Sequence, residues 1–237
     1  MDSLPQELVD AIIDNVPESS FLSCSLVAKR WRRKSQQCAF DSISFMSENQ
    51  VNRWRKNIPQ DSNGIPSYVR SAQFVAIPCW TDPALFGRVL KDFTSLKMLY
   101  ISETGIPKEL SGSISRGGIG KGITTLMILY PWCSHITTVS IILSLPNLKE
   151  LRIENDGFPS EEPLPMHPVV PRRRPLYSLT LRENVIGVGG SLVKYQFTST
   201  HLSLDVHIRG VEQLLMLSSE TVVELRLYGV WFLWVLT

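Results

Sequence analysis

The first forty residues carry a helical pattern of apolar and polar positions. The spacing predicts an amphipathic first helix, whose apolar stripe consists of Leu4, Leu8, Ile12 and Val16. Pro17 ends this helix, and the apolar residues within 21–27 predict a second one. A third helix continues through the basic run around Trp31 to about residue 38. So short a block carries more apolar surface than it can bury by itself, which points to a binding partner.

From residue 69 onward another pattern recurs, with apolar residues at the first, fourth and sixth positions of a six-residue stretch. Leu96, Leu99 and Ile101 form one copy. The fourth positions of the copies are Ala72, Leu99, Leu126, Leu151, Leu179, Leu202 and Leu225. Their separations of 27, 27, 25, 28, 23 and 23 residues match the leucine-rich repeat unit of about 20–29 residues. We therefore expect each copy to form a short strand and the copies to stack.

The copies are similar to irregular leucine-rich repeats. The asparagine or cysteine that usually stands three residues after the last strand leucine occurs once, as Asn184. Amphipathic return helices are predicted over 84–93, 136–145 and 211–217, and another helix over 47–58. The alternative is a general α/β domain in which the repeated leucines match by coincidence.

The predicted fold class is α/β, in two parts. Residues 1–45 form a three-helix module, and residues 46–237 form an irregular leucine-rich-repeat solenoid with a curved parallel sheet and helices or loops on its convex side. The proline-rich stretch 159–175 is expected to be a loop inserted between two repeats. The chain stops on the apolar run 229–237 without a polar capping repeat, so we expect a truncated solenoid.

The N-terminal block resembles the F-box motif over residues 3–43. The resemblance rests on the pairs Leu4-Pro5, Glu7-Leu8, Ile12-Ile13 and Leu26-Val27, followed by Trp31, all at the expected separations without a gap. The motif departs from the family at Ala28, where cysteine is common.

The resemblance implies that this block folds as three helices and binds a Skp-family adaptor, which links it to a cullin-RING ubiquitin ligase. It implies adaptor-facing or supporting apolar contacts from Leu4, Pro5, Leu8, Ile12, Leu22, Leu26 and Val27. Trp31 would lock the third helix.

In a leucine-rich solenoid, the residues between the inward leucines line the concave face. The candidate target-binding residues are Tyr100, Met127, Arg152 and Arg226, with Arg182 and Tyr228 flanking them. This mixture of aromatic and charged side chains is typical of protein-binding surfaces. The alternative is a solvated sheet face without a ligand.

Composition excludes several other functions. The 237-residue chain has a formal net charge of only +2, which argues against a nucleic-acid-binding surface. Its longest apolar runs, 136–145 and 230–236, are too short to span a bilayer. The four cysteines have wide, irregular gaps that favour free thiols in a reducing compartment. We therefore expect a protein of the cytoplasm, the nucleus or both, with no membrane partner.

Chemical motifs are lacking. The glycine-rich run 116–124 has Ser115 and Gly122 where a phosphate-binding loop needs glycine and a hydroxyl residue. The histidines and cysteines have no metal-ligand spacing. We expect no catalytic residues, no metal and no cofactor, and hence no enzyme.

Two hypotheses remain. In the first, the chain is a substrate receptor of a Skp–cullin–F-box ubiquitin ligase, which binds the adaptor through its N-terminal helices and a protein target through its repeats. In the second, it is a non-catalytic repeat scaffold whose N-terminal helices only cap the solenoid.

Overall fold

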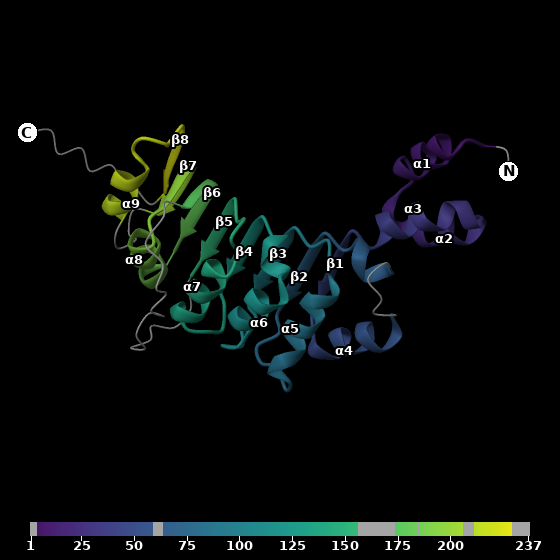
Figure 1. The fold of residues 1–237 in the computed structure, drawn as a ribbon, viewed down its shortest axis with the longest axis horizontal. Helices are drawn as coiled ribbons and strands as arrows, with labels where there is room; N and C mark the ends of the chain where they lie inside the picture. Colours follow the sequence, from purple (N-terminus) through teal and green to yellow (C-terminus); the bar gives the residue numbers. More distant parts are fainter. Residues whose placement is uncertain (1–3, 59–63, 156–173, 184, 206–210, 229–237) are drawn as a thin grey trace, which may run out of the picture.

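A computed structural model describes residues 4–58, 64–155, 174–183, 185–205 and 211–228 of the chain. Its N-terminal unit consists of the short helices α1 (Gln6–Asp14), α2 (Phe21–Val27) and α3 (Lys29–Ala39), with the turn η1 (Glu18–Ser20) before α2. This unit projects from one end of a long sheet (Figure 1).

The described remainder contains one eight-stranded parallel sheet whose strands follow chain order. They are β1 (Ser42–Phe45), β2 (Ser71–Val75), β3 (Met98–Ser102), β4 (Thr125–Leu129), β5 (Glu150–Glu154), β6 (Arg174–Arg182), β7 (Phe197–Asp205) and β8 (Glu224–Tyr228). The parallel sheet that the repeated pattern predicts is thus present. Residues 42–45, which the sequence groups with the N-terminal helices, pair with β2 and belong to this sheet.

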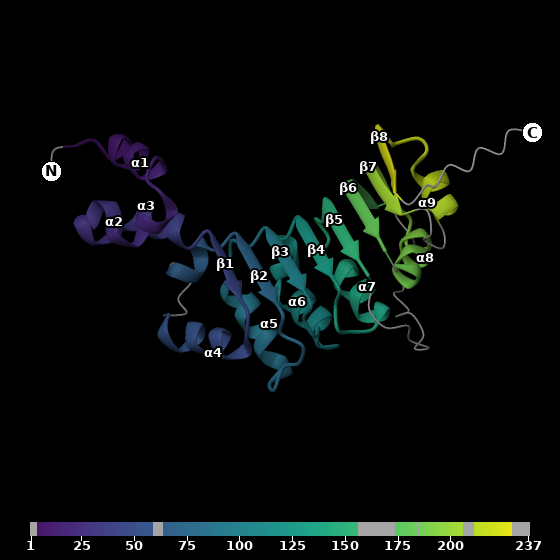
Figure 2. The ribbon, with the colours of Figure 1, turned by 180° about the vertical axis from the view of Figure 1, so that it is seen from behind.

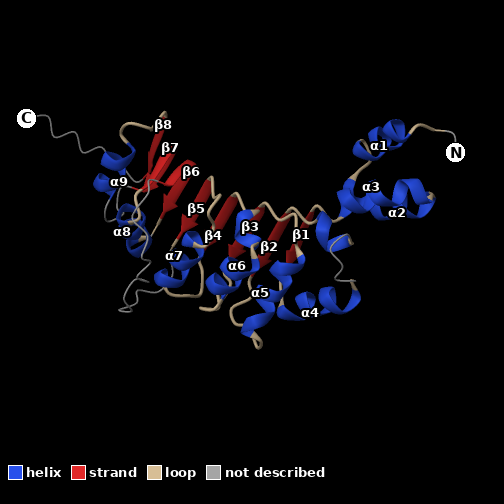
Figure 3. Cartoon of the chain, viewed as in Figure 1, coloured by secondary structure: helices blue, strands red, loops and turns tan. Residues whose placement is uncertain are grey.

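Helices cover one face of the sheet and leave the other face open along the described chain (Figures 2 and 3). They are α4 (Glu48–Asn57), α5 (Pro83–Asp92), α6 (Leu110–Gly117), α7 (His135–Leu143), α8 (Ile186–Lys194) and α9 (Val211–Ser218), with the turns η2 (Ile65–Tyr68) and η3 (Ile119–Lys121). Each helix packs beside the next, from α4 to α9. The helices predicted at 47–58, 84–93, 136–145 and 211–217 correspond to α4, α5, α7 and α9.

The strand register aligns the repeated leucines in rows. Leu99 lies opposite Ala72 on one side and Leu126 on the other, and the same row runs on to Leu225. A parallel row begins at Phe45 and runs through Phe74 to Leu227. From β2 to β7 both rows are buried against the helices, where each leucine contributes about 1.5–3 kcal/mol of transfer free energy. The leucines are therefore the core of the sheet.

A left-handed residue follows each of five successive strands. These residues are Ala76, Glu103, Tyr130, Asn155 and Glu183, with φ between 47 and 58°. The N–H groups of the first four donate to the carbonyl oxygen that ends the next strand, for example Tyr130 to Glu154 at 2.8 Å. The ladder therefore continues one residue past each of these four strands. The same turn is adopted by alanine, tyrosine, asparagine and two glutamates.

Two helices, α6 and α8, are not among those predicted from the sequence, and both contain glycines. Gly187, Gly189 and Gly190 lie within α8, and the run 116–124 begins inside α6. Gly118 then ends α6 at φ 70°, a conformation that glycine adopts without strain. Gly120 approaches the carbonyl oxygen of Ser144 so closely that a Cβ atom would overlap it. This run therefore serves chain packing.

The proline-rich stretch is only partly described. Residues 159–173 lie outside the described residues, as do Asn184 and the apolar run 229–237, so the loop and truncation predictions stay predictions. Pro175, however, lies in β6 and not in a loop. It pairs with Thr198 of β7, while the pairing with β5 begins only at Ser178, so its missing N–H leaves no β5 partner unsatisfied.

Candidate functional site

The N-terminal helices bury one apolar face and expose another. Val9 and Ile13 of α1 are fully buried, and α1 packs on α3. Large apolar side chains of α1 and α2 are exposed, and we call this set the docking face: Leu8, Ile12, Leu22, Leu26 and Val27. Leu26 is 83% exposed and Leu22 56%. Water contact at apolar side chains of this size is costly, so the docking face is a candidate interaction surface.

The other three residues that the F-box resemblance selects are not part of the docking face. Pro5 is exposed and precedes the first turn of α1, whereas Leu4 and Trp31 are half-buried. The Trp31 Nε1 atom is buried without a hydrogen-bond partner among the described residues. Trp31 therefore packs within the first turn of α3 and is not part of the docking face.

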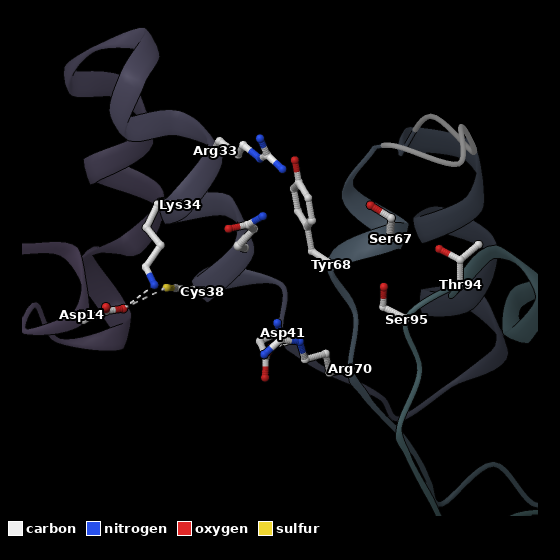
Figure 4. Close-up of a pocket in the computed structure, with 11 residues that line it drawn as sticks. Asp14, Arg33, Lys34, Cys38, Asp41, Ser67, Tyr68, Arg70, Thr94 and Ser95 are labelled. Carbon is white, nitrogen blue, oxygen red and sulfur yellow. Dashed lines mark hydrogen bonds and ion pairs between the residues drawn. The ribbon is translucent and has the colours of Figure 1, made fainter. Parts of the chain in front are cut away.

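The N-terminal unit and the sheet have separate apolar cores. The large buried cluster begins at Phe45 and does not include Val9 or Ile13. Phe40, at the end of α3, contacts Trp54 of α4 with ring centroids 5.9 Å apart. Elsewhere a polar cavity of about 710 Å³ lies between the two units. Arg33 and Tyr68 point toward each other across it (Figure 4).

Charged pairs line this junction. Lys34 Nζ lies 2.7 Å from Asp14 Oδ1, and this hydrogen bond raises the pKa of the Lys34 ammonium group. Burial raises the pKa of the neighbouring Cys38 thiol. On the sheet side, Arg70 Nε lies 3.6 Å from Asp41 Oδ1. The cavity is therefore polar and lined by charges of both signs, unlike the docking face.

A second candidate site is a trough of about 270 Å³ on the open face of β5 to β8. Its floor contains Thr180 and Ser203, which lie in one register row with Arg152 on one side and Arg226 on the other. The lining residues are Arg152, Tyr177, Ser178, Thr180, Arg182, His201, Leu202, Ser203, Glu224, Arg226 and Tyr228.

Ion pairs and aromatic contacts order the trough walls. Arg152 Nε donates to Glu154 Oε1 at 3.0 Å, and Arg226 Nε donates to Glu224 Oε1 at 2.7 Å. The Arg182 guanidinium lies 4.2 Å from the Tyr228 ring centroid. Hydrogen bonds with Ser203 and then Arg182 lower the pKa of the Tyr228 phenol. The phenol therefore faces donor groups.

The structure brings four of the six predicted target-binding residues together. Arg152, Arg182, Arg226 and Tyr228 all line the trough. Tyr100 and Met127 share the row of Arg152 but lie on β3 and β4, outside it. Sequence reasoning missed Tyr177 and His201, whose rings lie 4.4 Å apart at the other end. Tyr177 precedes Ser178, which the register pairs with His201. The proximity of the two rings therefore follows only from the alignment of β6 with β7.

Other chemistry finds no support in the described residues. They contain no group of three His, Cys, Asp or Glu side chains arranged to hold a metal ion. The four cysteines are thiols, none of them in a disulfide. None of the described helices has the length and apolar character needed to cross a membrane.

The described chain thus joins a helical unit with exposed apolar side chains to a sheet with one open face. Residues 1–42 match the family model of the F-box domain. An F-box domain in general suggests the substrate-receptor role in a Skp–cullin–F-box ubiquitin ligase, and such domains typically bind the Skp-family adaptor. A comparison with curated proteins finds no match to the chain.

Proposed function

We propose that this chain is a non-catalytic substrate receptor of a Skp–cullin–F-box ubiquitin ligase. Its docking face binds the Skp-family adaptor, and its irregular leucine-rich repeats bind a target protein with the open face of the sheet. It acts in the cytoplasm, the nucleus or both. The observation that carries the proposal is that the F-box segment exposes its apolar side chains, from Leu8 to Leu26, to solvent.

The position of the docking face favours adaptor binding over a capping role. A cap would turn the apolar faces of α1 and α2 onto the sheet, yet Leu26 is the most exposed large apolar side chain among the described residues. At the first end of the sheet, Trp54 of α4 packs on the core. Its ring packs edge-on against Phe45 and Phe93, with centroids 5.9 and 6.0 Å apart. Helix α4 therefore covers the core at this end, where Phe40 of α3 also contacts Trp54.

The two-part arrangement also suggests how such a receptor would work without catalytic groups. A target held on the open face is kept near the ligase by the N-terminal unit. Holding two reactants together raises their effective concentration and removes much of the entropic barrier to transfer. The separate cores mean that binding at one surface does not require unfolding at the other.

Binding of the full chain to a purified Skp-family adaptor tests the proposal. We expect a stable complex by calorimetry, and we expect Leu26→Asp or Leu8→Asp to weaken it by at least about 100-fold, because each places a charge in an apolar interface. Met216→Asp is the matched control, since Met216 is equally apolar and 68% exposed but lies on α9.

The expected control result is unchanged adaptor affinity for Met216→Asp. A full chain that does not bind the adaptor would overturn the proposal. So would Leu26→Asp or Leu8→Asp variants that bind as tightly as the unmodified chain. Circular dichroism of each variant separates lost binding from lost folding.

A further inference from the structure

The cavity between the N-terminal unit and the sheet is large enough to hold a small molecule. Its volume of about 710 Å³ lies within the range of about 300–1,000 Å³ that is usual for ligand pockets. Helix α3 contributes Arg33 and Lys34 to one wall, whereas η2 and the segment after α5 form the opposite wall (Figure 4). The two walls belong to units with separate apolar cores, so a ligand in this cavity contacts both units.

One cation of the cavity is left for a ligand. The two other lining cations each pair with an aspartate, as described above. Arg33 has no carboxylate partner among the described residues. Its guanidinium and the Tyr68 side chain point toward each other from opposite walls (Figure 4). A planar guanidinium can bind two oxygens of one phosphate group, and a phenol can donate a further hydrogen bond to it.

A second cavity extends the positive charge around Arg33. Its volume is about 450 Å³, it lies along α1 and α3, and it shares Arg33, Lys34 and Gln37 with the junction cavity. Five cations and three carboxylates line the two cavities: Lys29, Arg30, Arg33, Lys34 and Arg70, and Asp10, Asp14 and Asp41. The excess of two positive charges matches one phosphomonoester, which carries a charge of about −1.5 to −2 at pH 7.

The remaining side chains favour a ligand that is rich in hydroxyl groups. Ser67, Thr94 and Ser95 bring hydroxyl groups to the wall that holds Tyr68 (Figure 4). Apart from the Tyr68 ring and the Cys38 thiol, every side chain that lines the junction cavity is charged, a hydroxyl or an amide. An acyl chain or another apolar group would take these side chains out of water without giving them partners, which is unfavourable.

We propose that the junction cavity binds a phosphorylated sugar or polyol. Arg33 holds the phosphate group, and the Tyr68 hydroxyl donates to it from the opposite wall. Thr94 and Ser95 bind hydroxyl groups of the ligand. Because the ligand contacts both units, it fixes the N-terminal unit relative to the sheet. None of the docking-face residues lines the cavity, so this site is separate from adaptor binding and goes beyond the proposed function.

Calorimetric titration of the full chain with glucose 6-phosphate, glucose and inorganic phosphate tests the proposal. We expect glucose 6-phosphate to bind at least about tenfold more tightly than either fragment, because only the whole molecule contacts both the guanidinium and the hydroxyl wall. Equal affinities for inorganic phosphate and glucose 6-phosphate would overturn the proposal, since they would indicate a site for an ion alone. Tighter binding of a phosphothreonine peptide than of glucose 6-phosphate would overturn it as well.

Substitutions on the two walls should weaken the binding of glucose 6-phosphate. We expect a loss of about tenfold or more for Arg33→Gln, which removes a charge-assisted interaction. Tyr68→Phe should cost about threefold, because it removes one neutral hydrogen bond. Arg32→Gln is the matched control, since Arg32 is an exposed neighbour on α3 that lines neither cavity. It should bind like the unmodified chain.

Hydrogen exchange locates the site and tests whether the ligand contacts both units. Saturating glucose 6-phosphate should slow amide exchange in α3 and η2 and leave α9 unchanged. The proposal is overturned by protection in one unit only, by unchanged affinity of Arg33→Gln, or by no binding at about 10 mM glucose 6-phosphate. Leu26→Asp should lose the adaptor and keep the affinity for glucose 6-phosphate, so the two proposals can fail separately.

Discussion

Leu26 of α2 and Leu126 of β4 show how differently the two parts of this chain use the same residue. Leu26 is 83% exposed, whereas Leu126 is fully buried between the sheet and its helices. The N-terminal unit has little interior beyond Val9 and Ile13, so three short helices cannot cover both of their apolar sides. Apolar character alone therefore does not distinguish a docking residue from a core residue. What distinguishes them is whether another layer of the protein covers the side chain.

The largest expected effect is the difference in free energy of unfolding between alanine substitutions of the two leucines. Leu126→Ala should lower the free energy of unfolding by about 2–5 kcal/mol, because it removes buried methyl groups and leaves a cavity. Leu26→Ala should change it by less than about 0.5 kcal/mol, since the side chain is already in water. Urea denaturation followed by circular dichroism measures both. A large loss of stability for Leu26→Ala would mean that the docking face is covered within the chain.

Two glycine substitutions extend the comparison of covered and uncovered positions to the sheet region. Gly120→Ala should cost about 1–3 kcal/mol, because the new Cβ atom overlaps the Ser144 carbonyl oxygen. Gly190→Ala is the matched control: this glycine lies in α8 with no atom near the added Cβ. It should stabilise the protein by about 0.5–1 kcal/mol. Thermal melting of both variants tests the pair, and equal shifts would refute the close approach at Gly120.

The leucine spacing was enough to predict the parallel sheet and the row of repeated leucines. Leu99, Leu126 and Leu151 stand in one row because a strand alternates its side chains and every copy starts at the same phase. The missed helices have a different cause. The α6 and α8 segments are rich in glycine, which lowers helix propensity, yet packing of Ile114 and Val188 against the core outweighs that cost. Strand β1 was missed because it precedes the first repeated copy.

The candidate sites were predictable to different degrees. The F-box motif is a local sequence pattern, so its exposed side chains could be named without coordinates. The trough is assembled from four strands whose alignment depends on repeat lengths of 28 and 23 residues. Sequence spacing placed Arg152 and Arg226 in one row, but the roles of Tyr177 and His201 required the register of β6 and β7.

A smaller effect tests the turns that end the strands. Ala76→Gly should stabilise the protein by about 1 kcal/mol, because Ala76 has φ 55° and a side chain in this region is strained. Ala84→Gly should destabilise it by up to about 1 kcal/mol, because Ala84 lies in helix α5. Both alanines are exposed, so burial does not bias the comparison. The two melting temperatures should shift in opposite directions. A lower melting temperature for Ala76→Gly would show that Ala76 is not strained.

The smallest effect concerns the ion pair between α3 and α1. Lys34→Gln should lower the stability of the N-terminal unit by no more than about 0.5 kcal/mol, because Lys34 and Asp14 are both partly in water. The pKa of Lys34 is raised above its usual 10.5 by the Asp14 hydrogen bond, so the contribution is complete below pH 10.5 and disappears as the pH rises through the raised pKa. Hydrogen exchange of the α1 and α3 amides measures the difference, which added salt should reduce. A loss of several kcal/mol would show that this unit depends on the ion pair and not on its small apolar core.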